Sequence, residues 1–217
     1  MKPMEQLIAT VTSTSDPGDA SRSPRAYLSS PDWRAKWIGL DEHHAEVLEM
    51  SMAAEQFVKR CLTDDGQPRL LVLSGKNGVG KTTVAQRIIE AVGLIGISAW
   101  SSGRCRKPPM SRSYHWQRLA SVKPGDRQGE TLWTECVELD MALLDDIGAE
   151  VDQFKSGLAA ENLRLMLEER KAKWTVVTTN IMPRDWSKAW DQRVEDRLHR
   201  NSIIVELKTA PSYLRRE

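Results

Sequence analysis

One short run in this chain has the composition of a phosphate-binding loop. Residues 75–82, called the phosphate loop below, read Gly-Lys-Asn-Gly-Val-Gly-Lys-Thr and fit the pattern G-x-x-x-x-G-K-[ST] at every position. The glycines of such a loop let backbone N–H groups point at phosphate oxygens, and the following helix offers its positive end. Its lysine contacts the β- and γ-phosphates, and its final hydroxyl ligates Mg²⁺. The residues predicted to bind the nucleotide are Gly75, Asn77, Gly78, Val79, Gly80, Lys81, Thr82 and Thr83. The alternative is an ordinary glycine-rich turn between a strand and a helix.

Polar residues at the ends of two later apolar runs could complete a site for hydrolysis. Asp145 and Asp146 follow the apolar residues 141–144, and Asn180 closes a third apolar strand, predicted at residues 175–179. We expect Asp145 to join Thr82 in holding the metal, through water, and Asp146 to polarise the attacking water. Asn180 is expected to orient that water against the γ-phosphate. The alternatives are a solvated turn for the two acids and a turn-forming role for the asparagine.

A sheet must bring these side chains together, because they lie far apart in the chain. Five strands are predicted, at Leu70–Ser74, Ile97–Ser101, Ala142–Asp146, Thr175–Thr179 and Ile203–Leu207. Helices are predicted between them, most clearly at Thr82–Val92 and Leu158–Ala172. Strands that are apolar on both faces and alternate with helices predict an α/β fold with a parallel sheet covered on both sides. A nucleotide would then lie at the carboxyl ends of the strands.

A local excess of positive charge lies within a nearly neutral chain. The net charge of the 217 residues is +1, yet seven basic residues and one acid lie between positions 103 and 127. Cations interleaved with aromatic rings are typical of single-stranded DNA binding. The predicted DNA contacts are Arg104, Arg106, Lys107, Arg112 and Arg118 to phosphates and Trp116 to a base. The alternative is a solvated basic loop with Trp116 packed in the core.

Composition also suggests how the chain is organised and where it works. Residues 12–31 are rich in Ser, Thr, Pro and Gly, which predicts a flexible arm over residues 1–40. Trp33, Trp37 and Ile38 have helical spacing in this arm and could dock in a partner's groove, or pack back on the core. The apolar runs are too short to cross a membrane, the N-terminus lacks a signal-like apolar region, and the three cysteines are too few for a disulfide framework. We therefore expect a cytoplasmic protein with no membrane partner.

In their order along the chain, these motifs resemble those of the AAA+ ATPases of the DnaC/IstB type, which comprise helicase loaders and transposition helper ATPases. The resemblance covers about residues 67–215, so residues 41–217 are expected to form the AAA+ domain. It also rests on Gln192-Arg193-Val194-Glu195-Asp196-Arg197-Leu198, which is similar to the family's R-V-x-x-R-L box. Residues 212–215 are similar to its terminal S-Y-R motif, although Leu214 interrupts the match. The resemblance implies that Arg197, or as second choice Arg193, is an arginine finger acting on a neighbouring subunit. The alternative is a surface arginine paired with Glu195 or Asp196.

The same resemblance implies a fold, a cofactor and partners. The fold would be a P-loop NTPase of the AAA+ type, with five parallel strands in the order 5-1-4-3-2, flanking helices and no full helical lid. ATP is favoured over GTP because the chain has no N-K-x-D guanine signature. The protein would assemble with itself in a ring or spiral, and its partners would be a replicative hexameric helicase and single-stranded DNA. The expected function is ATP-dependent helicase loading in DNA replication. The alternatives are an IstB-like transposition helper and a nucleotide-gated adaptor with negligible hydrolysis.

Overall fold

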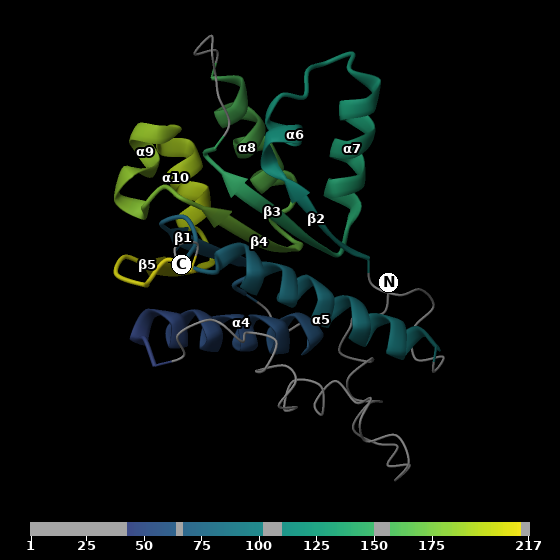
Figure 1. The fold of residues 1–217 in the computed structure, drawn as a ribbon. Helices are drawn as coiled ribbons and strands as arrows, with labels where there is room; N and C mark the ends of the chain where they lie inside the picture. Colours follow the sequence, from purple (N-terminus) through teal and green to yellow (C-terminus); the bar gives the residue numbers. More distant parts are fainter. Residues whose placement is uncertain (1–42, 64–66, 102–109, 150–156, 214–217) are drawn as a thin grey trace.

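A five-stranded parallel sheet with helices on both faces forms the body of the protein (Figure 1). The computed structural model describes residues 43–63, 67–101, 110–149 and 157–213. The strands are β1 (Leu70–Gly75), β2 (Ser111–His115), β3 (Met141–Ile147), β4 (Trp174–Thr179) and β5 (Ser202–Leu207). Their spatial order is β2-β3-β4-β1-β5, and every neighbouring pair is parallel. The predicted fold class and strand order are both confirmed.

The helices bury the two faces of the sheet in separate cores. One face is covered by α4 (Ala45–Thr63) and α5 (Lys81–Ser101). The other is covered by α6 (Trp116–Ala120), α7 (Arg127–Glu138), α8 (Leu158–Glu169), α9 (Trp186–Ala189) and α10 (Gln192–His199), with a short 3-10 helix, η2 (Pro183–Asp185), before α9. Successive strand residues point to opposite faces, so Leu71 and Leu73 pack in the first core and Val72 packs in the second. This two-sided burial explains why the central strands consist mostly of apolar and β-branched residues. Among the described residues, no helix has both the length and the apolar character needed to cross a membrane.

The predicted second strand is wrong. Ile97–Ser101 forms the end of helix α5, and the second strand is Ser111–His115. A short apolar run is compatible with either a buried strand or a buried helix, and here it continues the helix that begins at Lys81. The true strand lies at the edge of the sheet and buries only Tyr114, so it lacks an apolar pattern.

Two buried polar side chains hold helix ends in place across long distances in the sequence. Arg170 is 2% exposed and donates hydrogen bonds to the carbonyls of Cys136, Leu139 (3.1 Å) and Trp174 (2.7 Å) and to Thr175 Oγ1 (3.1 Å). Asn162 Nδ2 lies close to three carbonyls at the end of α6, namely those of Leu119, Ala120 and Val122. The last carbonyls of a helix have no partner within the helix, and these side chains supply hydrogen-bond donors to carbonyls at the ends of α6 and α7.

Candidate active site

The phosphate loop connects β1 to α5, which is the context that the sequence predicts. Gly75 ends β1, and Lys81 begins the helix. A Cβ atom on Gly75 would lie 2.6 Å from Leu207 Cβ and 2.7 Å from the Leu207 carbonyl oxygen, so only glycine lets β1 lie this close to β5. Gly78 and Gly80 have φ angles of +81° and +93°, which other residues rarely adopt. The loop therefore depends on its glycines for its path.

Lys81 lies in the centre of the site and is almost fully buried. Its Nζ donates hydrogen bonds to the carbonyls of Gly75 (2.8 Å) and Lys76 (2.8 Å) and to Asn180 Oδ1 (2.9 Å). Burial lowers the pKa of Lys81 to about 8, although the nearby carboxylates of Asp146 and Asp145 act in the opposite direction. The ammonium group is thus mostly charged at neutral pH and loses its proton more easily than an exposed lysine.

Asp145 and Thr82 form an oxygen-rich corner beside the phosphate loop. Asp145 Oδ1 accepts hydrogen bonds from Thr82 Oγ1 (2.9 Å) and Thr178 Oγ1 (2.7 Å). The Thr178 hydroxyl also accepts from the Asp146 N–H (2.8 Å), so β4 holds both acids of β3 in place. A carboxylate and a hydroxyl within hydrogen-bond distance supply the hard oxygen ligands that Mg²⁺ prefers. These two residues fit the magnesium role predicted for them.

Asp146 and Asn180 face each other across the ends of β3 and β4. The backbone of Asp146 is left-handed, with φ of +63°, and the pairing of β3 with β4 shifts register between Leu144 and Ile147. Asn180 Nδ2 donates to Asp146 Oδ1 (2.8 Å), while Asn180 Oδ1 accepts from Lys81. Both ends of the amide are therefore engaged, and Asn180 links the lysine of the phosphate loop to the second acid. A left-handed aspartate costs about 1–2 kcal/mol, which these hydrogen bonds help to offset.

The structure adds contacts around this site that sequence reasoning missed. His115 ends β2 opposite Asp145, and its Nδ1 lies 3.9 Å from Asp145 Oδ2. On the other side, the Tyr213 N–H donates to the Gly78 carbonyl (2.9 Å), so the chain after β5 touches the phosphate loop. Glu46 holds that segment by accepting from the backbone N–H groups of Thr209 and Ala210, both at 2.8 Å. The position of His115 could have been noticed only with β2 correctly placed, and the other contacts have no local sequence signal.

Arg197, the first candidate for the arginine finger, lies far from the phosphate loop of its own chain. Arg197 lines a pocket that also includes Leu70, where β1 begins, whereas the phosphate loop follows the other end of this strand. Six residues of extended strand span about 17 Å. Arg197 donates to the Arg193 carbonyl (3.0 Å), and its Nε lies 3.3 Å from Glu168 Oε2. The acidic partner of Arg197 is therefore Glu168 on α8, and not Glu195 or Asp196 as the alternative supposed. The Arg193 side chain is exposed.

The structure changes the predicted DNA surface. Trp116 is 0% exposed and packs in the core beneath α6, so the prediction that its ring stacks on a base is wrong, and the alternative of a core tryptophan is confirmed. Trp116 begins a short helix whose apolar side chains must cover the sheet. Arg112 forms an ion pair with Glu135, and Arg118 is exposed on α6. Several predicted residues lie outside the described residues, namely Arg104, Arg106, Lys107, Trp33, Trp37, Ile38 and the rest of the arm over residues 1–40.

Comparison with known proteins supports the fold. No protein-family model and no curated protein sequence matches the chain. Among solved structures, the DnaC helicase loader is similar with a TM-score of 0.58 and 18% identity, over 81% of this chain and 99% of that one. DnaI is similar with a TM-score of 0.57 and 18% identity, over 82% and 94% of the two chains. DnaA from Aquifex aeolicus, solved with bound AMPPCP, has a TM-score of 0.53 and 17% identity over 73% and 47%. At these identities the likeness establishes the fold, which agrees with the predicted one.

Proposed function

We propose that this chain, which has the fold of the DnaC-type AAA+ ATPases, is an ATP-dependent helicase loader acting in DNA replication. One observation carries the ATPase part of the proposal. Lys81, Thr82, Asp145, Asp146 and Asn180 come from three parts of the chain. They form one hydrogen-bonded network at the carboxyl edge of the sheet, in which the Thr178 hydroxyl links Asp145 to Asp146. The similarity to DnaC over nearly all of that chain supports a loader.

Each residue of the network has a role in this proposal. Lys81 exchanges its carbonyl partners for the β- and γ-phosphates of ATP, which the backbone N–H groups of the loop also bind. Thr82 and Asp145 would hold Mg²⁺, which would offset the charge of the phosphates. Asp146 accepts a proton from the attacking water, and Asn180 orients that water.

Self-assembly completes the site. In the proposed assembly, a ring or spiral, Arg197 reaches the nucleotide of a neighbouring copy and stabilises the charge that develops during hydrolysis, with Arg193 as the second candidate. Its distance from the phosphate loop of its own chain supports a role between copies. The proposed partners are a replicative hexameric helicase and single-stranded DNA, the latter through Arg112, Arg118 and the basic residues at positions 104–107.

A loading assay tests the proposal. The chain, Mg²⁺ and ATP are mixed with a purified hexameric replicative helicase and a closed circle of single-stranded DNA. The helicase that remains on the circle after gel filtration is then measured. We expect the chain to increase the amount of loaded helicase, because a closed ring cannot thread onto a circle unaided, and we expect Lys81→Ala to remove the increase. Failure to bind the helicase, with binding to a transposase instead, would identify a transposition helper.

The pKa of Lys81 predicts how ATP affinity changes with pH. Phosphates bind the protonated ammonium, and the free protein loses this proton as the pH rises through about 8. Binding must then restore the proton, so we expect the Kd for ATP to rise above pH 8 by up to about tenfold per pH unit. Calorimetric titrations between pH 7 and 9.5, in buffers with different ionisation enthalpies, would measure both the affinity and the proton uptake. Lys81→Arg is the matched control, since a guanidinium stays protonated in this range. An equal pH dependence in this variant would assign the effect to another group.

A further inference from the structure

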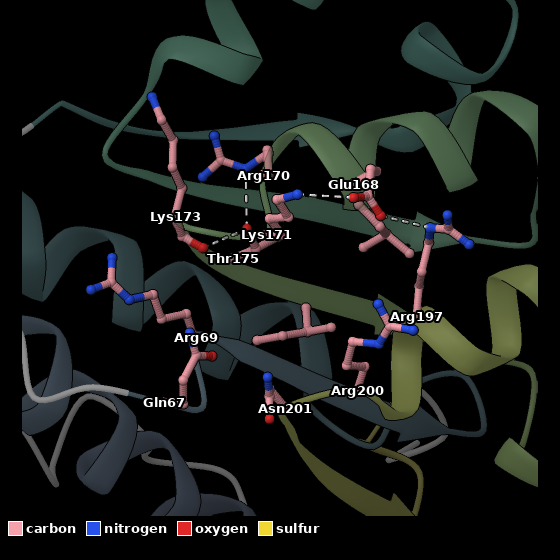
Figure 2. A pocket seen from close by; sticks show the side chains of 12 residues that line it. Gln67, Arg69, Glu168, Arg170, Lys171, Lys173, Thr175, Arg197, Arg200 and Asn201 are labelled. Atoms are coloured by element: carbon pink, nitrogen blue, oxygen red, sulfur yellow. Dashed lines mark hydrogen bonds and ion pairs between the residues drawn. The ribbon is translucent and has the colours of Figure 1, made fainter.

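A positively charged pocket opens at the amino edge of the sheet, opposite the phosphate loop (Figure 2). Its lining residues come from three segments: residues 67–70 at the start of β1, residues 167–175 from the end of α8 to the start of β4, and residues 197–201 at the end of α10. Besides the buried Arg170, its basic lining residues are Arg69, Lys171, Lys173, Arg197 and Arg200, and its one carboxylate is that of Glu168. Gathering like charges in a concave surface is unfavourable without an anion, so this pocket has the electrostatics of a site for an anionic ligand.

The basic side chains of the pocket differ in how many hydrogen bonds and ion pairs they already form within the chain. Arg69 donates to the Ala172 carbonyl (2.6 Å) and lies over the ring of Trp174, and Lys173 donates to the Glu138 carbonyl (2.8 Å). Arg200 is exposed, and its side chain has no partner among the residues that the structure describes. Arg200 follows Arg197 by three residues at the end of α10, and both side chains lie on the α10 side of the pocket in Figure 2. Arg200 is therefore the cation most open to an added anion, while Arg197, on the same side of the pocket, is paired with Glu168.

Glu168 occupies Arg197 in the isolated chain. Its Oε2 lies 3.3 Å from Arg197 Nε, and its Oε1 accepts from Lys171 Nζ (3.1 Å). The hydrogen bond from Lys171, together with the positive charge of Arg197, lowers the pKa of Glu168, so the group is an anion at neutral pH. Yet Arg197 Nε is a buried donor without a well-aligned hydrogen-bond partner among the described residues. The carboxylate thus neutralises the arginine without satisfying it.

We propose that Glu168 is a resident counterion which holds Arg197 until the terminal phosphate of a nucleotide bound to a second copy of this chain displaces it, with Arg200 contacting the same phosphate. This inference rests on the proposed role of Arg197 between copies. Glu168 is a positioning residue, since it acts through Arg197, while Arg200 contacts the ligand.

The exchange is favourable because a phosphate is a better partner than this carboxylate. A terminal phosphate offers three oxygens and more negative charge, and a guanidinium binds two of those oxygens at once. Displacing Glu168 costs little, because the side chains of the pair are 40% (Glu168) and 23% (Arg197) exposed and such pairs are weak. Lys171 remains beside Glu168 after the exchange, so the carboxylate is not left unpaired. Copies would therefore associate more readily when the neighbouring site holds a triphosphate.

The test compares self-association of Glu168→Gln with that of a matched control. Glu161→Gln makes the same change on the same helix, but Glu161 pairs with Arg164 and does not line the pocket. Glu161 interacts with Arg197 through charge alone, so this control also removes a nearby negative charge without removing a contact to that arginine. Sedimentation velocity, with Mg²⁺ and either a non-hydrolysable ATP analogue or ADP, would give the association constants. We expect Glu168→Gln to associate about two- to fivefold more tightly with the analogue, the range for a weak surface pair, and to be unchanged with ADP. Glu161→Gln should behave as the unmodified chain, and Arg200→Ala should associate several-fold more weakly with the analogue.

The outcomes separate this inference from the function on which it rests. In an Arg197→Ala background, Glu168→Gln should have no effect, because the carboxylate acts only through that arginine. If Arg197→Ala weakens association but Glu168→Gln matches Glu161→Gln, the counterion role alone is overturned. An equal gain with ADP also overturns it, since it would show a general effect of charge. If the unmodified chain does not self-associate with either nucleotide, or Arg197→Ala changes nothing, both this inference and the proposed role of Arg197 are wrong.

Discussion

Replacing Asp146 with asparagine is expected to lower the rate of ATP hydrolysis by about 10²- to 10⁴-fold, the range for losing a general base, while ATP binding persists. An amide has nearly the shape of the carboxylate but cannot accept a proton from water at neutral pH. The fold should tolerate the change, because asparagine adopts the left-handed backbone that Asp146 has, with φ of +63°. The side-chain oxygen can still accept the hydrogen bond from Asn180.

Single-turnover hydrolysis, measured beside calorimetric ATP binding, would separate the two effects of Asp146→Asn. Asp185→Asn is the control, since Asp185 is a half-exposed acid on η2 whose ion pairs within the described part of the chain are local, with Arg184 and Lys188. A normal rate in Asp146→Asn would show that another group serves as the base. If the unmodified chain binds ATP but never hydrolyses it, even with DNA present, the chain is a nucleotide-gated adaptor.

Replacing Arg170 with methionine is expected to lower the free energy of unfolding by about 3–5 kcal/mol. The variant fills much of the same space but leaves the carbonyls of Cys136, Leu139 and Trp174 without the donor that they have now. Each buried acceptor left unpaired costs about 1–3 kcal/mol. Since a folded domain is stable by about 5–15 kcal/mol in total, this single change would remove a large share.

Urea denaturation of the nucleotide-free protein, followed by circular dichroism, would measure the loss. The control is Arg184→Met, because Arg184 is exposed on η2 and pairs only with its neighbour Asp185. We expect the midpoint of unfolding to stay unchanged in the control and to fall clearly in Arg170→Met. Equal midpoints in the two variants would mean that the buried hydrogen bonds add no net stability.

Four of the five strands were predictable because each carries a short run of apolar or β-branched residues. Strands β1, β3 and β4 are buried on both faces, and β5 retains Val205 and Leu207 in the core. The fifth, β2, was missed because an edge strand with one buried residue has no apolar signature, while the end of α5 has one. The strand order followed from the family resemblance, since local patterns do not specify which strands are neighbours.

The residue types of the candidate site can be recognised from the sequence alone. The phosphate loop, the two acids of β3 and Asn180 are recognisable because each role requires a particular residue type at a particular distance from a strand end. These requirements involve residues that are neighbours in the chain, so the motifs can be found in the sequence.

Which of these groups contact one another depends on how the chain folds. The Asn180 amide joins Lys81 to Asp146 because β4 lies between β1 and β3. Trp116, which the sequence analysis predicted to bind DNA, is buried in the folded chain. Folding also places Glu168 beside Arg197. Such contacts join residues that are distant in the chain and depend on how helices pack on the sheet. No local sequence motif predicts these contacts.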